Sequence, residues 1–227
     1  MTHKISLELN GKSLHLETGR LALTANAAVM ATYGETIVLA TVVASTNQTS
    51  LDYFPLFVEY QEKLYAGGRI KGSRWVKREG KPSDEAILTA RLIDRSIRPL
   101  FPMSFKQEVQ VIVTVLSVDS ENDADIPAII ATSAALALSD IPWEGPIGAV
   151  RIGLTKREDQ SEFIVNPAYS ERQVSDLDLV ISGTHDATIM VESGAKEVDE
   201  TRMLKAFKLG EEKNGEIAQA IATWAKE

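Results

Sequence analysis

The sequence predicts an α+β domain with a mixed β-sheet and packed helices. Three observations support this class: strand-like segments occur in both halves of the chain, one apolar helix lies between them, and the final part is helical. Strands and helices that do not alternate regularly are typical of α+β proteins. The 227 residues suit one large domain, or one domain and part of another.

The first half is predicted to form six strands. Ile5, Leu7 and Leu9 alternate with polar residues before Asn10-Gly11, a favoured two-residue hairpin turn, and the alternation resumes after it. Two further strands flank Gly34-Glu35. Segments 54–61 and 108–119 complete the set, and the second of these is rich in β-branched residues.

The second half begins with a helix predicted from Pro127 to about Leu138, which is apolar on all sides and therefore expected to be buried. Strands are predicted at 147–154, 162–166, 177–184 and 187–193. The tail from 199 is predicted to be helical with a break near Gly210 or Gly215. Its apolar stripe of Ile217, Ile221 and Trp224 has to be covered, either by the sheet or by a helical region beyond residue 227.

Composition and charge restrict the class of protein. The formal net charge is −8, which argues weakly against a generic nucleic-acid binder. However, residues 63–98 hold ten basic and four acidic side chains, so this span carries +6 and the remainder −14. Such a patch can guide a polyanion to one place. The absence of cysteine, of an apolar signal-peptide core and of a membrane-length apolar run makes a cytoplasmic protein the expectation.

The basic span starts with a glycine-rich segment, 65–83, predicted to be a loop. Gly67 and Gly72 have the spacing of a phosphate-binding loop, but the required Lys-Ser/Thr pair is missing. Trp75 lies in this loop among cationic residues, an arrangement that suits stacking on an unpaired base. The alternative is that Trp75 anchors the loop on a partner subunit.

A helix is predicted to follow Pro82, with Ser83 as N-cap, and to end before Pro99. Arg91, Arg95 and Arg98 fall on one stripe of this helix at positions i, i+4 and i+7. Three guanidinium groups on one stripe could hold phosphates or carboxylates at a cleft or interface. Equally, Asp94 could pair with Arg91 or Arg98, and the row would then only tie the helix to nearby acids.

The segment "FVEYQEKLYAGGRIKGSRWVKREGKPSDEAILTARLIDRSIRPLFP" (57–102) closely resembles the first ribonuclease-PH-like domain of the polynucleotide phosphorylase family. "LETGRLALTANAAVMATYGETIVLATVV", "PIGAVRIG", "LDLVISGT" and "MVES" resemble the same family in the same order, so the resemblance covers almost the whole chain.

The resemblance implies RNA-binding residues. Family members have a loop of two aromatics and two arginines that lines the central channel of a trimeric ring and grips single-stranded RNA. Trp75, Val76, Lys77 and Arg78 occupy this place, so one aromatic and one arginine are replaced. We expect Trp75 and Arg78 to carry most of the binding, with Arg91, Arg95 and Arg98 meeting RNA phosphates or bracing a domain interface.

The resemblance also implies a reaction. Inorganic phosphate, the co-substrate, attacks the 3′-terminal phosphodiester of RNA and releases a nucleoside diphosphate with the help of Mg²⁺ or Mn²⁺, a step in mRNA degradation. The catalytic and metal-binding residues belong to a second ribonuclease-PH-like domain that this chain does not contain. The expected partners are therefore single-stranded RNA, that second domain and a homotrimeric ring. Residues 1–209 are predicted to form the first domain and 210–227 the start of a helical linker domain.

The residues themselves predict that this chain holds no catalytic or metal-binding site. Where active domains have a hydroxyl-rich phosphate turn, Asp123 and Asp125 would repel phosphate and Pro127 has no N–H to donate. Asp178 could stand for one of two catalytic aspartates, but Arg172 takes the place of the other. Asp176 and Asp178 are better explained as polar residues at the start of a strand.

Two alternatives remain open on the sequence. The chain could be a stand-alone, non-catalytic scaffold subunit of an exosome-type ring that binds single-stranded RNA, although its last helix ends with an open apolar stripe. A complete, active ribonuclease-PH-type enzyme fits the length but not the missing phosphate turn.

Overall fold

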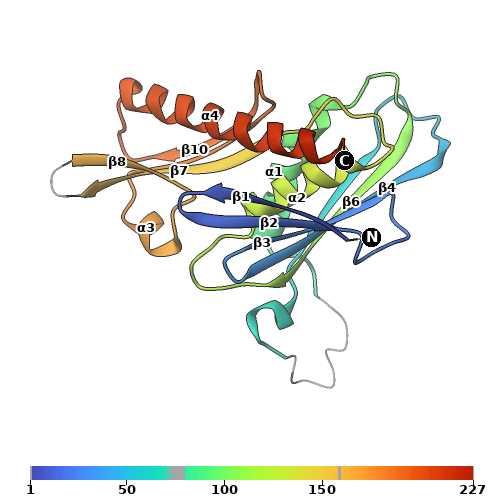
Figure 1. Cartoon of the computed structure of the whole chain (residues 1–227), viewed down its shortest axis with the longest axis horizontal. Helices are drawn as coiled ribbons and strands as arrows, with labels where there is room; N and C mark the ends of the chain where they lie inside the picture. The colour runs from blue at the N-terminus through green and yellow to red at the C-terminus, as the bar shows by residue number, and fades with distance from the viewer. Residues whose placement is uncertain (1, 71, 73–79, 158–159, 227) are drawn as a thin grey trace.

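The computed structural model describes residues 2–70, 72, 80–157 and 160–226 (Figure 1). Two β-sheets enclose a central helix, and a long C-terminal helix lies along the second sheet. The strands are β1 (His3–Leu9), β2 (Lys12–Thr18), β3 (Ala27–Tyr33), β4 (Thr36–Gln48), β5 (Leu56–Gln61), β6 (Gln107–Ser117), β7 (Gly148–Arg157), β8 (Gln160–Val165), β9 (Leu177–Gly183) and β10 (Thr188–Ala195). The helices are η1 (Leu64–Gly67), α1 (Asp84–Ile97), η2 (Arg98–Leu100), α2 (Asp125–Leu138), α3 (Tyr169–Gln173) and α4 (Glu200–Trp224).

The first sheet is mixed, as predicted. Its strand order is β1-β2-β3-β4-β6-β5, and every neighbouring pair is antiparallel except β5 and β6, which are parallel. The predicted hairpin forms at Asn10 and Gly11, which both have positive φ, as a tight two-residue turn requires. Strand β5 lies at one edge of this sheet, where it forms part of a candidate binding surface.

The second sheet is antiparallel, with the order β10-β9-β7-β8. Helix α2 packs on β3 and β4 of the first sheet and also contacts β7 of the second. Its residues from Asp125 to Leu136 are all buried, which explains why the segment is apolar on every side. The helix starts two residues before the predicted Pro127.

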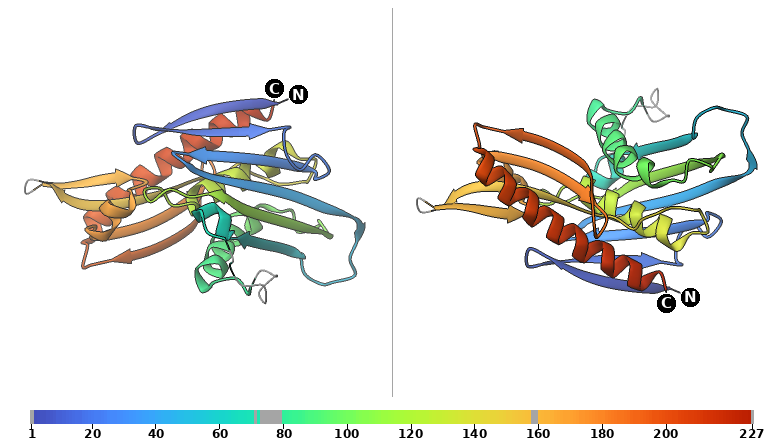
Figure 2. Two further views of the ribbon diagram at one scale, coloured as in Figure 1. Left: turned by 90° about the horizontal axis from the view of Figure 1, so that it is seen from below. Right: turned by 90° about the horizontal axis from the view of Figure 1, so that it is seen from above.

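Helix α1 lies beside β5, on the face of the first sheet that also carries α2 (Figure 2). It starts as predicted, because the Ser83 hydroxyl accepts a hydrogen bond from the N–H of Ala86 at 3.0 Å. Ile93 and Ile97 are buried on its inner face, whereas Arg91 and Arg95 are exposed on the outer face.

The predicted break in the C-terminal helix was wrong. Helix α4 runs without interruption from Glu200 to Trp224, through both glycines. At Gly210, a Cβ atom would lie only 2.4 Å from the Cγ2 atom of Ile181, so the glycine allows close contact with β9. The stripe of Ile217, Ile221 and Trp224 is buried and not open, because α4 packs against β7, β9 and α2.

Candidate functional site

The basic segment of the sequence contributes only its second part to the described structure. Trp75, Val76, Lys77 and Arg78, the residues expected to grip RNA, lie outside the described residues. Arg91, Arg95 and Arg98 lie on α1 and its C-cap, so their roles can be compared with the two interpretations left open by the sequence.

Arg98 is a structural residue. Its Nε atom donates to Asp94 Oδ1 at 2.7 Å, and its two Nη atoms donate to the carbonyl oxygens of Phe54 and Leu56 at 3.2 and 3.1 Å. The hydrogen bond to Asp94 raises the pKa of Arg98, so the side chain stays charged. Arg98 therefore holds the end of α1 against the start of β5, as the interpretation of an internal ion pair predicted.

Arg91 and Arg95 behave differently. Both are exposed, and neither forms an ion pair or side-chain hydrogen bond within the described part of the chain. They line a cleft of about 570 Å³ between α1 and β5, together with Phe57 and Ile87, whose side chains are about half exposed. This volume is within the usual range of ligand sites. Two unpaired guanidinium groups beside apolar side chains suit a ligand with both anionic and apolar parts.

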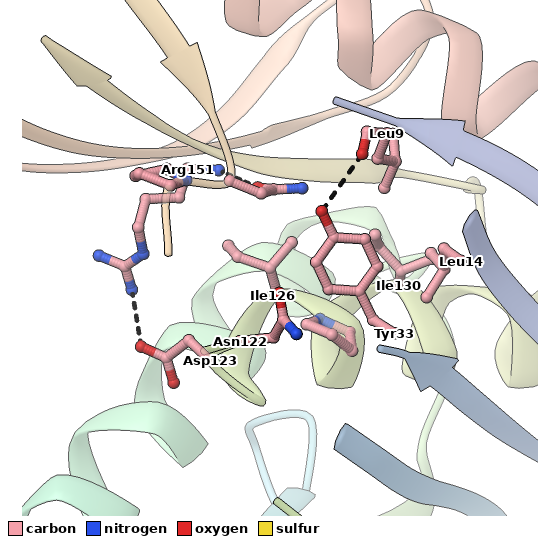
Figure 3. A pocket seen from close by; sticks show the side chains of 11 residues that line it. Leu9, Leu14, Tyr33, Asn122, Asp123, Ile126, Ile130 and Arg151 are labelled. Carbon is pink, nitrogen blue, oxygen red and sulfur yellow. Dashed lines mark hydrogen bonds and ion pairs between the residues drawn. The ribbon is translucent and has the colours of Figure 1, made fainter. Parts of the chain in front are cut away.

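A cluster of ion pairs, some buried and some partly exposed, lies beyond α1 at the N-terminus of α2. Arg151, on β7, has a side chain that is only 8% exposed, and it donates hydrogen bonds to Asp125 and Asp178. A third carboxylate, that of Asp123, lies 3.8 Å from Arg151 Nη2 (Figure 3). Arg151 thus connects α2, β7 and the start of β9.

Arg172, the second-last residue of α3, completes the cluster. It donates to Asp123, and its Nη2 atom lies 3.0 Å from Asp178 Oδ2. Burial would raise the pKa of Asp178, but the attraction and hydrogen bonds of Arg151 and then Arg172 outweigh it and hold this pKa below its ordinary value. Asp125 is more deeply buried, and burial raises its pKa in spite of Arg151.

The cluster faces a cleft of about 730 Å³ that is unsuited to phosphate. Eight charged side chains line this cleft: Glu62, Lys63, Glu85, Asp123, Asp125, Arg151, Arg172 and Asp178. Five are acidic, so the lining has a net charge of −2, and both arginines are already bound to carboxylates. Asp123 and Asp125, which the sequence analysis expected to repel phosphate, are two of these five acids.

A divalent metal ion does not fit here either. Across the described ranges, no three His, Asp or Glu side chains are placed to hold a metal ion. The carboxylates of Asp123, Asp125 and Asp178, which such an ion would need, are bound to guanidinium groups. The prediction of Asp178 as a simple polar residue at a strand start was incomplete, because it is a member of this cluster.

Sequence reasoning missed Arg151 altogether. It noted Arg172 only as the residue that replaces a carboxylate, and did not foresee its pairing with Asp123. A signal was present: Arg151 is the one charged residue in the predicted strand 147–154, and a charge in a buried strand requires a buried partner of opposite sign.

A smaller cavity adjoins the cluster on its other side (Figure 3). Its volume is about 20 Å³, and Tyr33 points into it and donates a hydrogen bond to the carbonyl of Leu9 at 3.2 Å. Burial raises the pKa of Tyr33 to about 12, so this hydroxyl stays neutral at physiological pH. A space of this size admits a water molecule and excludes a nucleotide. The clefts beside α1 are therefore the candidate ligand sites.

No helix in the described parts of the chain has the length and apolar character needed to cross a membrane.

Comparison with protein families gives two matches. Residues 10–142 match the model of the 3′ exoribonuclease family, domain 1, and residues 145–213 match domain 2 of the same family. Both parts of this family model therefore lie within a single copy of the fold described above. Rice (Oryza sativa) Rrp46, known from a crystal structure, shares this fold with a TM-score of 0.73 and 16% identity, covering 93% of this chain and 94% of that one.

Several curated relatives are much more similar in sequence. The polyribonucleotide nucleotidyltransferase of Desulforamulus reducens is 50% identical over 221 residues, which are 97% of this chain and 29% of that protein. The enzymes of the same name from Bradyrhizobium sp. and Exiguobacterium sibiricum are 51% and 54% identical over 99% and 90% of this chain. The chain spans less than a third of the length of these relatives.

Proposed function

The chain belongs to the 3′ exoribonuclease family, and from this premise we propose that it is the N-terminal, non-catalytic RNA-channel and assembly domain of a polyribonucleotide nucleotidyltransferase. The observation that carries this proposal is the 50–54% identity to enzymes of that name over 90–99% of the chain. The complete protein would then degrade RNA from its 3′ end in the cytoplasm, with phosphate as co-substrate and nucleoside diphosphates as products.

In this proposal the chemistry takes place in a second ribonuclease-PH-like domain of the longer protein. Phosphorolysis requires donors that hold the attacking phosphate and, in this family, a divalent cation. The described residues supply neither in the expected place, since the ion-pair cluster uses its arginines and aspartates on one another. The role left to this chain is to bind RNA and to assemble with the second domain in a homotrimeric ring.

Arg91 and Arg95 are the described residues that we assign to RNA phosphates. Both guanidinium groups are exposed and unpaired within the described structure, and both face the cleft beside β5. Arg98, which was expected to share this role, is instead engaged by Asp94 and two carbonyl groups. Trp75, Lys77 and Arg78 remain proposed contacts on the family resemblance, with Val76 beside them, and Trp75 would stack on a base.

The position of the linker domain is also part of the proposal. We keep residues 1–209 as the first domain and 210–227 as the beginning of a helical region. The sequence argument for a boundary at Gly210 was a helix break, and α4 has no such break. Any boundary in this region would therefore run through a continuous helix that packs on the second sheet.

The RNA-binding role can be tested by the salt dependence of binding. Each phosphate contact to single-stranded nucleic acid contributes about −0.7 to the slope of log K against log salt. The double variant Arg91→Ala/Arg95→Ala should therefore bind a uridine oligomer more weakly, with a slope less negative by about 1.4. Lys208→Ala, which removes an exposed charge on α4, is the control and should leave the slope unchanged. An unchanged slope in the double variant would reject this assignment.

Two further measurements address the rest of the proposal. The chain alone, given poly(A), phosphate and Mg²⁺, should release no nucleoside diphosphate at an enzymatic rate. Replacing Trp75 and Arg78 by alanine in the longer protein should lower both RNA affinity and processivity. Diphosphate release by the chain alone would show that it is an active enzyme and would contradict the non-catalytic role.

A further inference from the structure

The outer edge of β5 presents main-chain polar groups to the cleft that holds Arg91 and Arg95. The carbonyl of Pro55 accepts from the N–H of Val109 at 3.0 Å, so Pro55 points its carbonyl inward to β6. The carbonyls of Phe54 and Leu56 point the other way, since both accept from Arg98. In a parallel pair, alternate residues direct both N–H and C=O to the same side.

This alternation places the N–H and C=O groups of Val58 and Tyr60 on the outward side of β5. Both residues line the cleft between β5 and α1, but Tyr60 is only 7% exposed, so the partly exposed Val58 is the one whose main chain a ligand can reach. The opposite wall of the cleft carries Arg91 and Arg95, one helical turn apart. The two acids that line the cleft already have donors: Asp94 of α1 is bound by Arg98, and Glu59 of β5 accepts from Gln61 Nε2 at 3.0 Å.

We propose that the outer edge of β5, through the main chain of Val58, hydrogen-bonds the Watson–Crick edge of an RNA base in a strand whose phosphates lie on Arg91 and Arg95. The inference rests on the proposed function and adds to it a contact with the unpaired bases of the RNA. Each of the four RNA bases has a donor beside an acceptor on its Watson–Crick edge, as adenine has at N6 and N1 and uracil at N3 and O4. One outward residue of a strand offers the complementary acceptor and donor. The cleft therefore binds any unpaired base and rejects RNA in which that edge is already paired.

A second polypeptide strand is the other ligand that an open sheet edge could bind. The structure favours RNA for two reasons. Arg98 already occupies the outward carbonyls of Phe54 and Leu56, which leaves two outward residues before β5 ends at Gln61. This open edge is short compared with a typical strand of about five to six residues. The unpaired charges on the facing wall are both cationic, which matches a ligand with one phosphate per base.

The test needs no protein variant in its first arm. Fluorescence anisotropy would compare the wild-type chain on a uridine oligomer of about twelve nucleotides and on the same oligomer of N3-methyluridine. The methyl group blocks the Watson–Crick edge but leaves the phosphates and the stacking face. We expect the methylated oligomer to bind about three- to tenfold more weakly, as the loss of one hydrogen-bonded pair predicts. Equal affinities would overturn the inference.

The second arm removes one main-chain donor. Val58→Pro eliminates an N–H that does not bond to β6, a position where an edge strand tolerates proline. Val58→Ala keeps the N–H and is the matched control. Val58→Pro should bind the uridine oligomer more weakly than Val58→Ala does, and methylation should have little further effect on it. If both variants bind the uridine oligomer equally, the inference fails. It also fails if Val58→Pro still binds the oligomer normally but no longer binds another protein chain.

The two proposals can fail separately. If Arg91→Ala/Arg95→Ala binds RNA as the wild type does, the proposed RNA cleft itself is wrong. If that variant loses affinity while methylation has no effect, the phosphates bind as proposed but the β5 edge does not read the bases. Should Val58→Pro fail to fold, the comparison of the two oligomers on the wild-type chain still decides the inference.

Discussion

Arg151 is the residue whose removal most directly tests the ion-pair cluster. Its side chain is 8% exposed, and that of its partner Asp125 is 11% exposed. Arg151→Met keeps most of the volume of the side chain but leaves Asp125 as a buried carboxylate without its counter-ion. Removing one partner of a buried pair in this way costs about 3–5 kcal/mol of the free energy of unfolding.

The loss should depend on pH in a defined direction. Burial already raises the pKa of Asp125 in the folded protein, and without Arg151 this pKa rises further. A group whose pKa is raised by folding destabilises the folded state when it is ionised and ceases to do so as the pH falls through that pKa. The cost of Arg151→Met should therefore be larger near about pH 7.5 than near about pH 5.5.

Urea unfolding of the wild type and the variant at both pH values measures this effect. Arg172→Met is the matched comparison, because its side chain is 25% exposed and its partners Asp123 and Asp178 are 29% and 41% exposed. It should cost about 1 kcal/mol, as expected for ion pairs that water can reach. A cost below about 1 kcal/mol for Arg151→Met, or one that is equal at both pH values, would refute the assignment of Arg151 as the central residue of the cluster.

Three further predictions concern elements around the proposed RNA cleft and the core. Arg98→Ala should lower the free energy of unfolding by about 1–2 kcal/mol, because it loses the hydrogen bonds to Asp94 and to β5. The RNA affinity of this variant at matched salt should stay within about twofold of the wild type. A loss of RNA affinity without a loss of stability in urea would contradict the structural role of Arg98. Ser83→Ala should cost about 1 kcal/mol through loss of the N-cap of α1, and no change in urea unfolding would mean that the cap contributes nothing. Gly210→Ala should destabilise by about 1–3 kcal/mol because the added Cβ meets Ile181 at 2.4 Å, whereas helix propensity alone predicts a gain of about 1 kcal/mol. The sign of that change in thermal or urea unfolding decides between the two.

The local elements could be predicted from the sequence because their signals are local. Alternation of apolar residues and the Asn10-Gly11 turn specify the first hairpin, and Ser83 specifies the start of α1. The pairing of strands is not a local property. Nothing in the segment 54–61 indicates that it lies parallel to β6 at the edge of the first sheet, since that arrangement depends on α1 crossing between the two strands.

The errors have a common cause in long-range packing. Glycine has a low helix propensity, which favoured a break near Gly210, but close contact with Ile181 makes a glycine necessary within the helix. Likewise, the spacing of Arg91, Arg95 and Arg98 correctly placed them on one stripe of α1. It could not separate their roles, because only the position of the Phe54 and Leu56 carbonyls distinguishes Arg98 from the other two.

Tyr60 lines two clefts that differ in charge, and this position connects the cluster with the proposed RNA cleft. It lines both the cleft that contains Arg91 and Arg95 and the acidic cleft beside Arg151 and Arg172. The first cleft has two basic and two acidic side chains, and its Arg91 and Arg95 have no ion pair within the described residues. The second cleft has a net charge of −2, and its Arg151 and Arg172 are bound to carboxylates. We therefore expect a polyanion that approaches α1 to be repelled by the second cleft and to find two available guanidinium groups in the first. In the proposed RNA-binding role, the acidic lining of the second cleft, which includes Glu62 and Glu85, would keep the RNA strand in the cleft along β5 without touching it.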